Sequence, residues 1–364
     1  MIRRLSALLL LAGCSVPAIT PGELPRSDHF DGRRFFNPDG EQGSGGDAKK
    51  GPVGLVESLF SRAHSWPIVP VTPTRPPARV EGEAMAVTWI GHSTVLVQTR
   101  GLNILTDPVW AERSSPVQFA GPRRVREPGV RLADLPRIDL VLLSHDHYDH
   151  LDTGTLKTLF DRDHPLIVTG LRNDALLARY DIKAQARDWG GRVGLRPGID
   201  VIVTRAHHWS GHGVGDHDRA LWSGFVVTLP GGNLYFAGDT GPGDMRWAVE
   251  ARRYGPVRFA LLPIGAYHFT GAETGNHIGP TQAVTAFEQL GAAYALGVHW
   301  GTFELTSEGI DQPRIELHRA LERAHIPLDR FRTTEVGQTW MSLPSAGTDQ
   351  PSRVTPHPII RPGI

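Results

Sequence analysis

The feature that most constrains this chain is a run of histidine and aspartate that directly follows a short apolar segment. Residues 138–143, IDLVLL, read as a buried strand, and the chain continues as SHDHYDHLD. Open α/β sheets build their sites at the carboxyl ends of strands. Four residues of this run are potential ligands for zinc or iron: His145, His147, Asp149 and His150. A catalytic zinc keeps an open position, so four ligands in six residues predict two metal ions. A hydrophilic loop with hydrogen-bonded histidines is the alternative.

Other residues of ligand type follow later apolar runs in the same way. His207 and His208 follow the apolar run 201–204, Asp239 follows the run 234–237, and His299 follows the run 293–298. One such coincidence carries little weight. Four strand ends in order indicate a single site assembled from distant segments.

The bulk composition is that of an ordinary globular protein. The chain has 364 residues, of which 40% are hydrophobic and 21% charged. Lys+Arg and Asp+Glu are both 38, so the formal net charge is zero and gives no strong attraction to nucleic acid. A single cysteine excludes an internal disulfide.

The first residues are typical of an export signal. Arg3 and Arg4 precede an apolar run at 5–11 that is too short to span a bilayer, and residues 1–13 are therefore interpreted as a signal peptide. The following LAGCS resembles the lipobox of bacterial lipoproteins, which implies a lipid anchor on Cys14. Because Ser15 is not an aspartate, we expect an exported lipoprotein that faces the periplasm, on the outer rather than the inner membrane. An ordinary cleaved signal with a chance cysteine is the alternative.

The rest of the chain divides into three parts. Residues 14–84 form a Pro/Gly-rich extension, with residues 15–50 expected as a tether, the aromatic stretch 29–36 expected to dock on the body, and one amphipathic helix at 52–64. Residues 85–343 form the main domain, and 344–364 a disordered tail. Strands are predicted at 86–90, 94–98, 102–105, 138–144, 166–169, 201–204, 223–229, 234–237, 259–263 and 293–298, and helices at 153–160 and 281–290. Two β-rich halves with interspersed helices predict an α/β (α+β) fold, a four-layer αββα sandwich.

These motifs also carry a family resemblance. The order HxHxDH, His, Asp, His resembles that of the metallo-β-lactamase superfamily. The chain resembles more narrowly the group of phospholipases D that hydrolyse N-acylphosphatidylethanolamine. The matching stretches, spread over roughly residues 85–305, are TWIGHSTVLVQ, LTDPVW, GPRRVR, DLPRIDLVLLSHDHYDHLD, HHWS, FAGDTG, LPIGAY, NHIGPTQAV and VHWGTF.

The resemblance implies a ligand set. One metal would be held by His145, His147 and His208, the other by Asp149, His150 and His299, with Asp239 bridging them. His208 matches because it directly precedes tryptophan, although its neighbour His207 leaves a second option. The ions implied are two zincs, with iron and manganese as alternatives. His277, in NHIGP, matches a histidine near the substrate, so Asp149, Asp239 and His277 are the residues expected to take part in catalysis.

Residues around the ligands have more than one interpretation. Asp107 resembles a carboxylate that orients a ligand histidine, but an aspartate that caps a turn before proline is an equal alternative. For His92 we favour a structural role. The arginines Arg123, Arg124, Arg126 and Arg131 are either phosphate contacts, the first two foremost, or exposed surface charge.

The function implied is metal-dependent phosphodiester hydrolysis. A hydroxide that bridges two zinc ions would attack the phosphorus of a glycerophospholipid such as N-acylphosphatidylethanolamine. The alternative is a lactonase or esterase, or a hydrolase of small phosphodiesters, which would use the same metals to cleave a different bond. A non-enzymatic envelope lipoprotein belongs to another class, and the complete ligand set argues against it. The expected partners are the phospholipid or ester substrate and the membrane, and a homodimer is one option for the oligomeric state.

Overall fold

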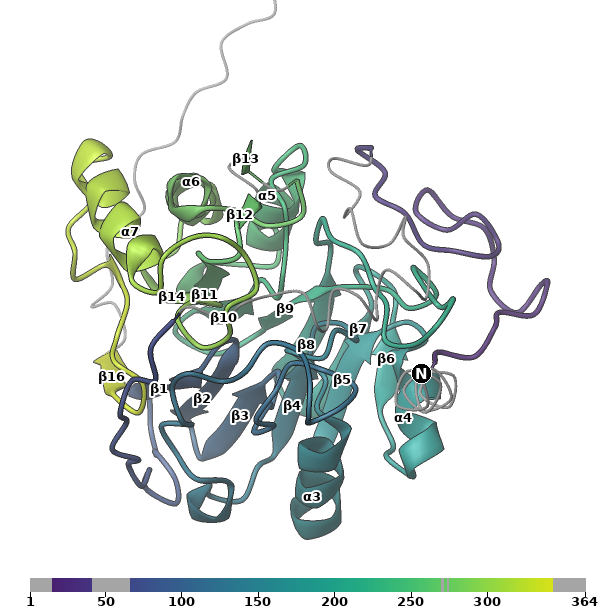
Figure 1. Ribbon diagram of the computed structural model, residues 1–364, viewed down its shortest axis with the longest axis horizontal. Coiled ribbons are helices and arrows are strands. Elements are labelled where there is room, and N and C mark those ends of the chain that lie inside the picture. The colour runs from purple at the N-terminus through teal and green to yellow at the C-terminus, as the bar shows by residue number, and fades with distance from the viewer. Residues whose placement is uncertain (1–14, 41–65, 270–271, 274, 343–364) are drawn as a thin grey trace, which may run out of the picture.

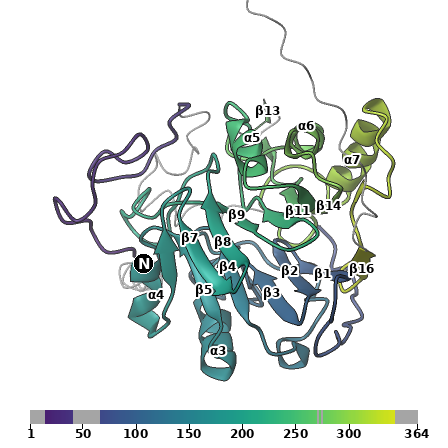
Figure 2. The same cartoon turned by 180° about the vertical axis from the view of Figure 1, so that it is seen from behind.

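The computed structural model describes residues 15–40, 66–269, 272–273 and 275–342. Two seven-stranded sheets pack face to face, and helices cover their outer sides, which confirms the predicted four-layer sandwich (Figures 1 and 2). The first sheet has the order β16 (Thr339–Ser342), β1 (Met85–Gly91), β2 (Thr94–Thr99), β3 (Leu102–Thr106), β4 (Leu140–Leu143), β5 (Leu166–Gly170) and β6 (Gln185–Arg187). The second has the order β15 (Phe331–Arg332), β14 (Tyr294–Val298), β11 (Val257–Pro263), β10 (Asn233–Phe236), β9 (Gly224–Val227), β8 (Ile199–Thr204) and β7 (Arg192–Arg196).

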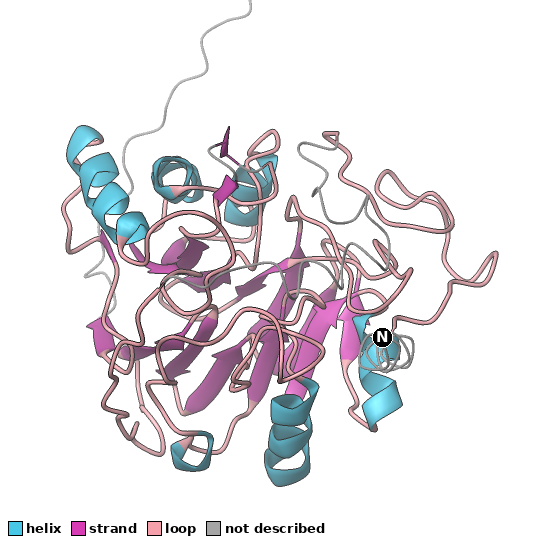
Figure 3. Ribbon diagram, in the orientation of Figure 1, coloured by secondary structure: helices cyan, strands magenta, loops and turns pink. Residues whose placement is uncertain are grey.

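The helices lie in two outer layers (Figure 3). Those on the side of the first sheet are α3 (Thr153–Asp163) and α4 (Asn173–Leu177), and those on the side of the second are α5 (Arg246–Arg252), α6 (Pro280–Leu290) and α7 (Gln312–Arg323). A short hairpin, β12 (His268–Phe269) with β13 (Ala272–Glu273), stands apart from both sheets. The short 3-10 turns are Leu132–Asp134 and Ala178–Tyr180.

Strand direction explains where the polar residues collect. β3, β4 and β5 run parallel, so their carboxyl ends share one edge of the first sheet. In the second sheet β10, β11 and β14 run parallel, and β8 has the same direction because β9 is antiparallel to both β8 and β10. The segments that follow β4, β8, β10 and β14 therefore meet at neighbouring edges of the two sheets.

The core between the sheets is apolar and continuous. It includes Val87 and Trp89 from the first sheet and Phe225 and Leu261 from the second, all at most 1% exposed. The buried stripe of α6, with Ala283 and Phe287 among its members, extends this core outward. At about 25 cal/mol per Å² of apolar surface, such burial is the main force that holds the sheets together.

The amino-terminal segment packs on the body. Phe30 and Phe35 are buried against Leu221 and Trp222, so docking of residues 29–36 is confirmed. Val16 is also fully buried, and its N–H donates to the carboxylate of Asp216 over 2.8 Å. The expected tether is therefore wrong for residues 15–40, which have a fixed place on the domain.

Some expectations concern other parts of the chain. The signal peptide, Cys14, the helix at 52–64 and the tail at 344–364 lie outside the described residues. Among the helices that are described, none is long and apolar enough to cross a membrane.

Candidate metal centre

The histidine-rich run forms a tight turn between β4 and α3. The N–H groups of His150 and Leu151 both donate to the carbonyl of His147, over 3.0 and 2.8 Å. Asp152 then caps α3 by accepting from the N–H groups of Gly154 and Thr155. The run is thus fixed at both ends, which holds its side chains toward the second sheet.

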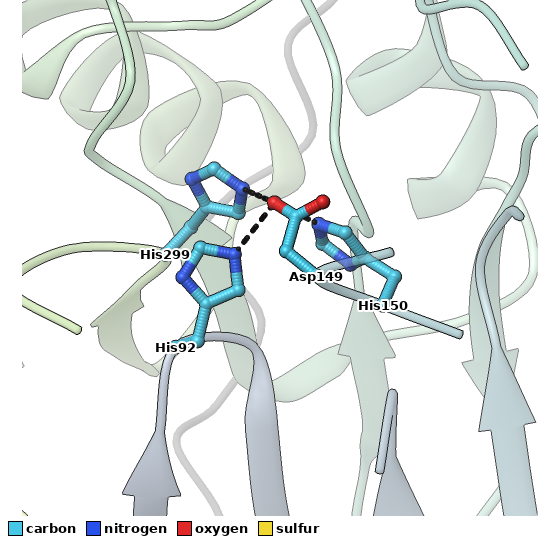
Figure 4. Close-up of side chains that lie close together, drawn as sticks. All are labelled: His92, Asp149, His150 and His299. Carbon is cyan, nitrogen blue, oxygen red and sulfur yellow. Dashed lines mark hydrogen bonds and ion pairs between the residues drawn. The ribbon is translucent and has the colours of Figure 1, made fainter. Parts of the chain in front are cut away.

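The potential ligand atoms gather in adjoining groups. One group contains His145, His147 and His208, with atoms within 4.8 Å of one another. Another, shown in Figure 4, contains Asp149, His150, His299 and His92 within the same distance. Asp239 joins His145 and His150 in a third group and His208 and His277 in a fourth, so all seven ligands expected from the sequence are brought together. His207 belongs to none of these groups, which favours His208 as the ligand among the described residues.

Asp239 lies between the two groups. Its Oδ2 is 3.0 Å from Nε2 of both His150 and His299. The same oxygen is 4.0 Å from Nε2 of His145 and 3.9 Å from Nε2 of His208. One carboxylate thus faces ligand candidates of both groups, as expected for a residue that bridges two ions.

The inward-facing atoms lack conventional partners. Among the described residues, Nε2 of His150 and His299 and both carboxylate oxygens of Asp239 are buried without a hydrogen bond of acceptable geometry, whereas His147 faces the group through Nδ1, 2.8 Å from His145 Nε2. Buried polar groups are normally satisfied, so a cluster of such atoms pointing at one another needs an explanation. Imidazole nitrogens and carboxylates around a common centre fit divalent cations.

The charge states also fit a cation site. Burial alone would raise the pKa of Asp239, but the positive charges of His150 and His299 hold it well below its usual range. Burial lowers the pKa of His147 and of His208 to about 3, so both rings are neutral at neutral pH. Against the effect of burial, Asp239 and Asp149 raise the pKa of His150, and Asp239 foremost raises the pKa of His299 to about 9, so a metal would displace a proton from each of these two rings.

The outer nitrogen of several rings is held by a neighbour. Asp107 Oδ2 accepts from His150 Nδ1 and from Ser144 Oγ, each over 2.6 Å. Because the Ser144 hydroxyl proton is used in this way, its oxygen accepts from His145 Nδ1 over 2.9 Å. His208 Nδ1 donates to the carbonyl of Asn276 over 2.8 Å. In each ring Nε2 is left facing the centre, an arrangement typical of metal-binding histidines.

His92 contacts two of the ligand candidates directly, which a purely structural role does not account for. Its Nε2 lies 2.9 Å from Asp149 Oδ2, and its carbonyl accepts from the N–H of His299 over 3.0 Å. His92, Asp107 and His299 all have positive φ, at 54°, 31° and 62°. Non-glycine residues in this region cluster at functional sites, where the surrounding fold holds them.

His277 lies on the open side of the cluster. Its Nδ1 is 3.7 Å from Asp239 Oδ2, its ring centroid is 5.0 Å from that of His208, and 17% of its side chain is exposed. Burial of the rest lowers its pKa to about 3. A neutral His277 is suited to form a hydrogen bond with the leaving group.

The arginines have other partners. Arg124 is 4% exposed, and its guanidinium donates to the carbonyls of Val109 and Ala111 and lies over the ring of Phe303. The structure therefore does not place Arg124 for phosphate binding. Its neighbour Arg123 is half exposed and pairs with Glu112 at 3.0 Å.

The other two arginines also have defined partners. Arg126 donates to the Gly301 carbonyl over 2.6 Å, two residues after His299, and so supports that loop. Arg131 is exposed and pairs with Asp134.

Similarity to known proteins agrees with this geometry. The sequence matches the Beta-lactamase superfamily domain over residues 102–300. It is 35% identical to N-acyl-phosphatidylethanolamine-hydrolyzing phospholipase D 1 of Caenorhabditis elegans, over 70% of this chain and 74% of that protein.

The chain belongs to the metallo-β-lactamase superfamily.

One further relative and one solved structure are similar to this chain. An archaeal UPF0173 metal-dependent hydrolase, from Pyrobaculum neutrophilum, is 31% identical over 61% of this chain and 86% of its own length. The structure of Igni18, a metallo hydrolase from Ignicoccus hospitalis, has a TM-score of 0.53 at 24% identity and covers 71% of this chain and 98% of that chain, which shows the shared fold. The protein is thus a metal-dependent hydrolase with the metallo-β-lactamase fold.

Proposed function

We propose that this protein is a dinuclear zinc-dependent phosphodiesterase of phospholipase D type that acts on N-acylphosphatidylethanolamine-like glycerophospholipids. The observation that carries the proposal is the shared carboxylate of Asp239 between two groups of ligand residues. The 35% identity to a phospholipase D named for this substrate supports the choice of bond. Zinc is the ion proposed because each group offers three histidine or aspartate ligands besides Asp239.

One set of residues would hold the ions, and another would contact the substrate. His145, His147 and His208 would hold one zinc ion, and Asp149, His150 and His299 the other, with Asp239 between them. When bound, two zinc ions lower the pKa of a shared water and neutralise charge that develops on phosphoryl oxygens. The chain's part is to hold imidazoles and ionised carboxylates in fixed positions before substrate arrives.

The open side of the site contributes two further side chains. His277 is positioned to contact the departing alkoxide, and its lowered pKa argues against the proton-donor role. Trp209 packs against His147 with ring centroids 4.1 Å apart, which shields that ligand from water. A small hollow next to His299, lined among others by Trp66, Phe303 and Leu305, is too small to hold an acyl chain.

A metal-dependent lactonase or esterase is the second candidate. One observation favours it: Arg124, the arginine expected to hold phosphate, is buried and donates to carbonyl groups instead. A neutral ester or lactone would not need such a cation. Both candidates use the same ligands, and substrate turnover separates them.

Attachment to a membrane is part of our proposal. A lipid on Cys14 would hold the enzyme at the surface of its substrate, facing the periplasm from the outer membrane. The support is the order of basic, apolar and small residues before Cys14. The intact mass of the protein isolated from cell envelopes tests this, and a chain without acyl groups on Cys14 contradicts it.

Lipid turnover is the experiment that tests the function. The protein from residue 15 onward, loaded with zinc, is incubated with bacterial lipid vesicles that contain N-acylphosphatidylethanolamine, and the products are read by mass spectrometry. We expect phosphatidic acid and N-acylethanolamine. His147→Ala should lower turnover by more than about 100-fold, because a metal ligand is lost. His318→Ala, on the exposed side of α7, is the matched control and should not change turnover. Full zinc occupancy without lipid turnover would exclude this substrate class and favour lactones.

A further inference from the structure

Asn37 in the amino-terminal segment is joined to a metal-ligand candidate far along the chain. Its Nδ2 donates to the carbonyl of His208 over 2.8 Å, and its Oδ1 accepts from the N–H of His208 over 3.2 Å, across a separation of 171 residues. Asn37 is 3% exposed. One side-chain amide therefore satisfies both backbone groups of His208, as a neighbouring strand would.

These contacts complete the support of His208. The ring is already fixed by the bond from Nδ1 to the Asn276 carbonyl. With backbone and ring both held, Nε2 stays aimed at the centre, 3.4 Å from His147 Nδ1. Asn37 also accepts from the indole N–H of Trp222 over 3.2 Å, so its own position is fixed by the core.

Asp39, two residues later, makes a second connection. Its carboxylate lies 3.0 Å from His207 Nδ1 and 2.9 Å from Arg205, and it accepts from the N–H of Asp244 over 2.8 Å. Asp244 belongs to the loop that follows Asp239. The packing is close: a Cβ at Gly243, where φ is +49°, would lie 2.1 Å from Asp39 Oδ2. The segment therefore holds both the His208 loop and the loop after Asp239.

We propose that Asn37 is a positioning residue of the metal centre and that residues 15–40 are a working part of it. The inference rests on the metal-binding part of the proposed function and is independent of the lipid substrate. Neighbours that orient metal ligands typically change metal affinity by roughly 10- to 100-fold when they are lost. We expect a loss of this size, confined to the group that contains His208.

The test compares two buried asparagines in the full chain, purified in detergent. Asn37→Ala is the test variant, and Asn233→Ala is its matched control. Asn233 is 5% exposed and likewise binds one N–H, of Leu229, and one carbonyl, of Tyr254, but at the start of β10, away from the metal centre. Zinc affinity is measured by competition with a chelator, and the environment of each site by the visible spectrum of the cobalt(II)-loaded protein.

The expected result is selective. Asn37→Ala should bind one of two zinc ions roughly 10- to 100-fold more weakly and change the cobalt spectrum, whereas Asn233→Ala should lose thermal stability without either effect. If Asn37→Ala does not fold, Asn37→Asp replaces it, because it keeps the size and the acceptor oxygen but loses the donor to His208. Wild-type affinity and spectrum in the folded variant would overturn the inference. A wild-type protein that binds no zinc would overturn both this inference and the metal centre, whereas failure to hydrolyse lipid would affect the substrate alone.

Discussion

Asp107 shows how a single side chain can set the state of two ligands. It accepts from His150 directly and from His145 through the hydroxyl of Ser144. It thereby fixes which nitrogen of each ring carries the proton. His145 also lies in the group with His147 and His208, and His150 also lies in the group with Asp149 and His299. The choice between a turn cap and an orienting carboxylate is thus decided by the contacts in favour of the second.

Asp107→Asn should therefore weaken metal binding. Asparagine keeps the size and tolerates the positive φ of this position, but its amide cannot accept from both neighbours as the carboxylate does. We expect a loss in zinc affinity of roughly 10- to 100-fold, measured by chelator competition. Asp163→Asn is the matched control, a buried carboxylate that accepts from the Ile138 N–H at the far end of β4. Equal affinities in both variants would contradict an orienting role.

At the level of elements, the sequence predicted those whose pattern is local. The strands that deliver ligands, β4, β8, β10 and β14, were visible because each is a short apolar run that ends at a histidine or aspartate. The missed elements include β6, β7, β15, β16, α5 and α7. β7 is RVGLR, with arginine at both ends, and β16 pairs only with β1 at the edge of its sheet. Edge strands bury little, so their sequences carry a weak periodic signal.

The seven ligand candidates were also predictable from the sequence. Each follows the end of a strand, and the family resemblance assigned them to two ions. The partners of Arg124 and the place of Asn37 were not predictable, because a hydrogen bond across 171 residues leaves no local pattern. The positive φ angles of His92 and His299 were likewise not predictable, because only the folded surroundings impose them.

The docked segment 15–40 contains a pH-dependent contact. His29 lies between Asp28 and Asp188, at 2.6 and 2.7 Å, and stacks on Trp189. Burial opposes protonation of His29, but the hydrogen bonds to Asp188 and Asp28 outweigh it and raise its pKa. A raised folded-state pKa stabilises the fold fully below the unfolded value, about 6.5, and this contribution is lost as pH rises through the folded value.

His29→Gln should therefore destabilise the protein more at pH 6 than at pH 9. The measurement is the free energy of unfolding of both proteins in urea across this range. Asp188→Asn should reduce the pH dependence, whereas Asp28→Asn should have a small effect because the side chain of Asp28 is 85% exposed. A difference between wild type and His29→Gln that grows with pH would contradict this assignment.

For the whole molecule, the metal centre joins the two sheets. His145, His147, Asp149 and His150 follow a strand of the first sheet, and His208, Asp239 and His299 follow strands of the second. An ion bound by both sets links the two halves at one edge. Because the unfolded chain does not hold these ligands together, binding adds to the stability of the fold.

Removing the metal should lower the thermal midpoint. Free zinc at 1,000 times its dissociation constant stabilises the folded state by about 4 kcal/mol. Calorimetry with zinc and with excess chelator measures the difference. His147→Ala should show a smaller shift between the two conditions. Identical midpoints with and without zinc in the wild-type protein would show that the cluster binds no metal in the folded state.

The bond between Asn37 and His208 also sets an order of events during synthesis. Asn37 leaves the ribosome 171 residues before its partner, which at typical rates of translation is a delay of roughly 10 to 30 seconds. The hydrogen bonds of Asn37 with Trp222 and His208 cannot form during that interval, and His299 emerges later still. The complete ligand set is therefore not available until residue 299 has emerged, and a nascent chain stalled before it holds an incomplete site.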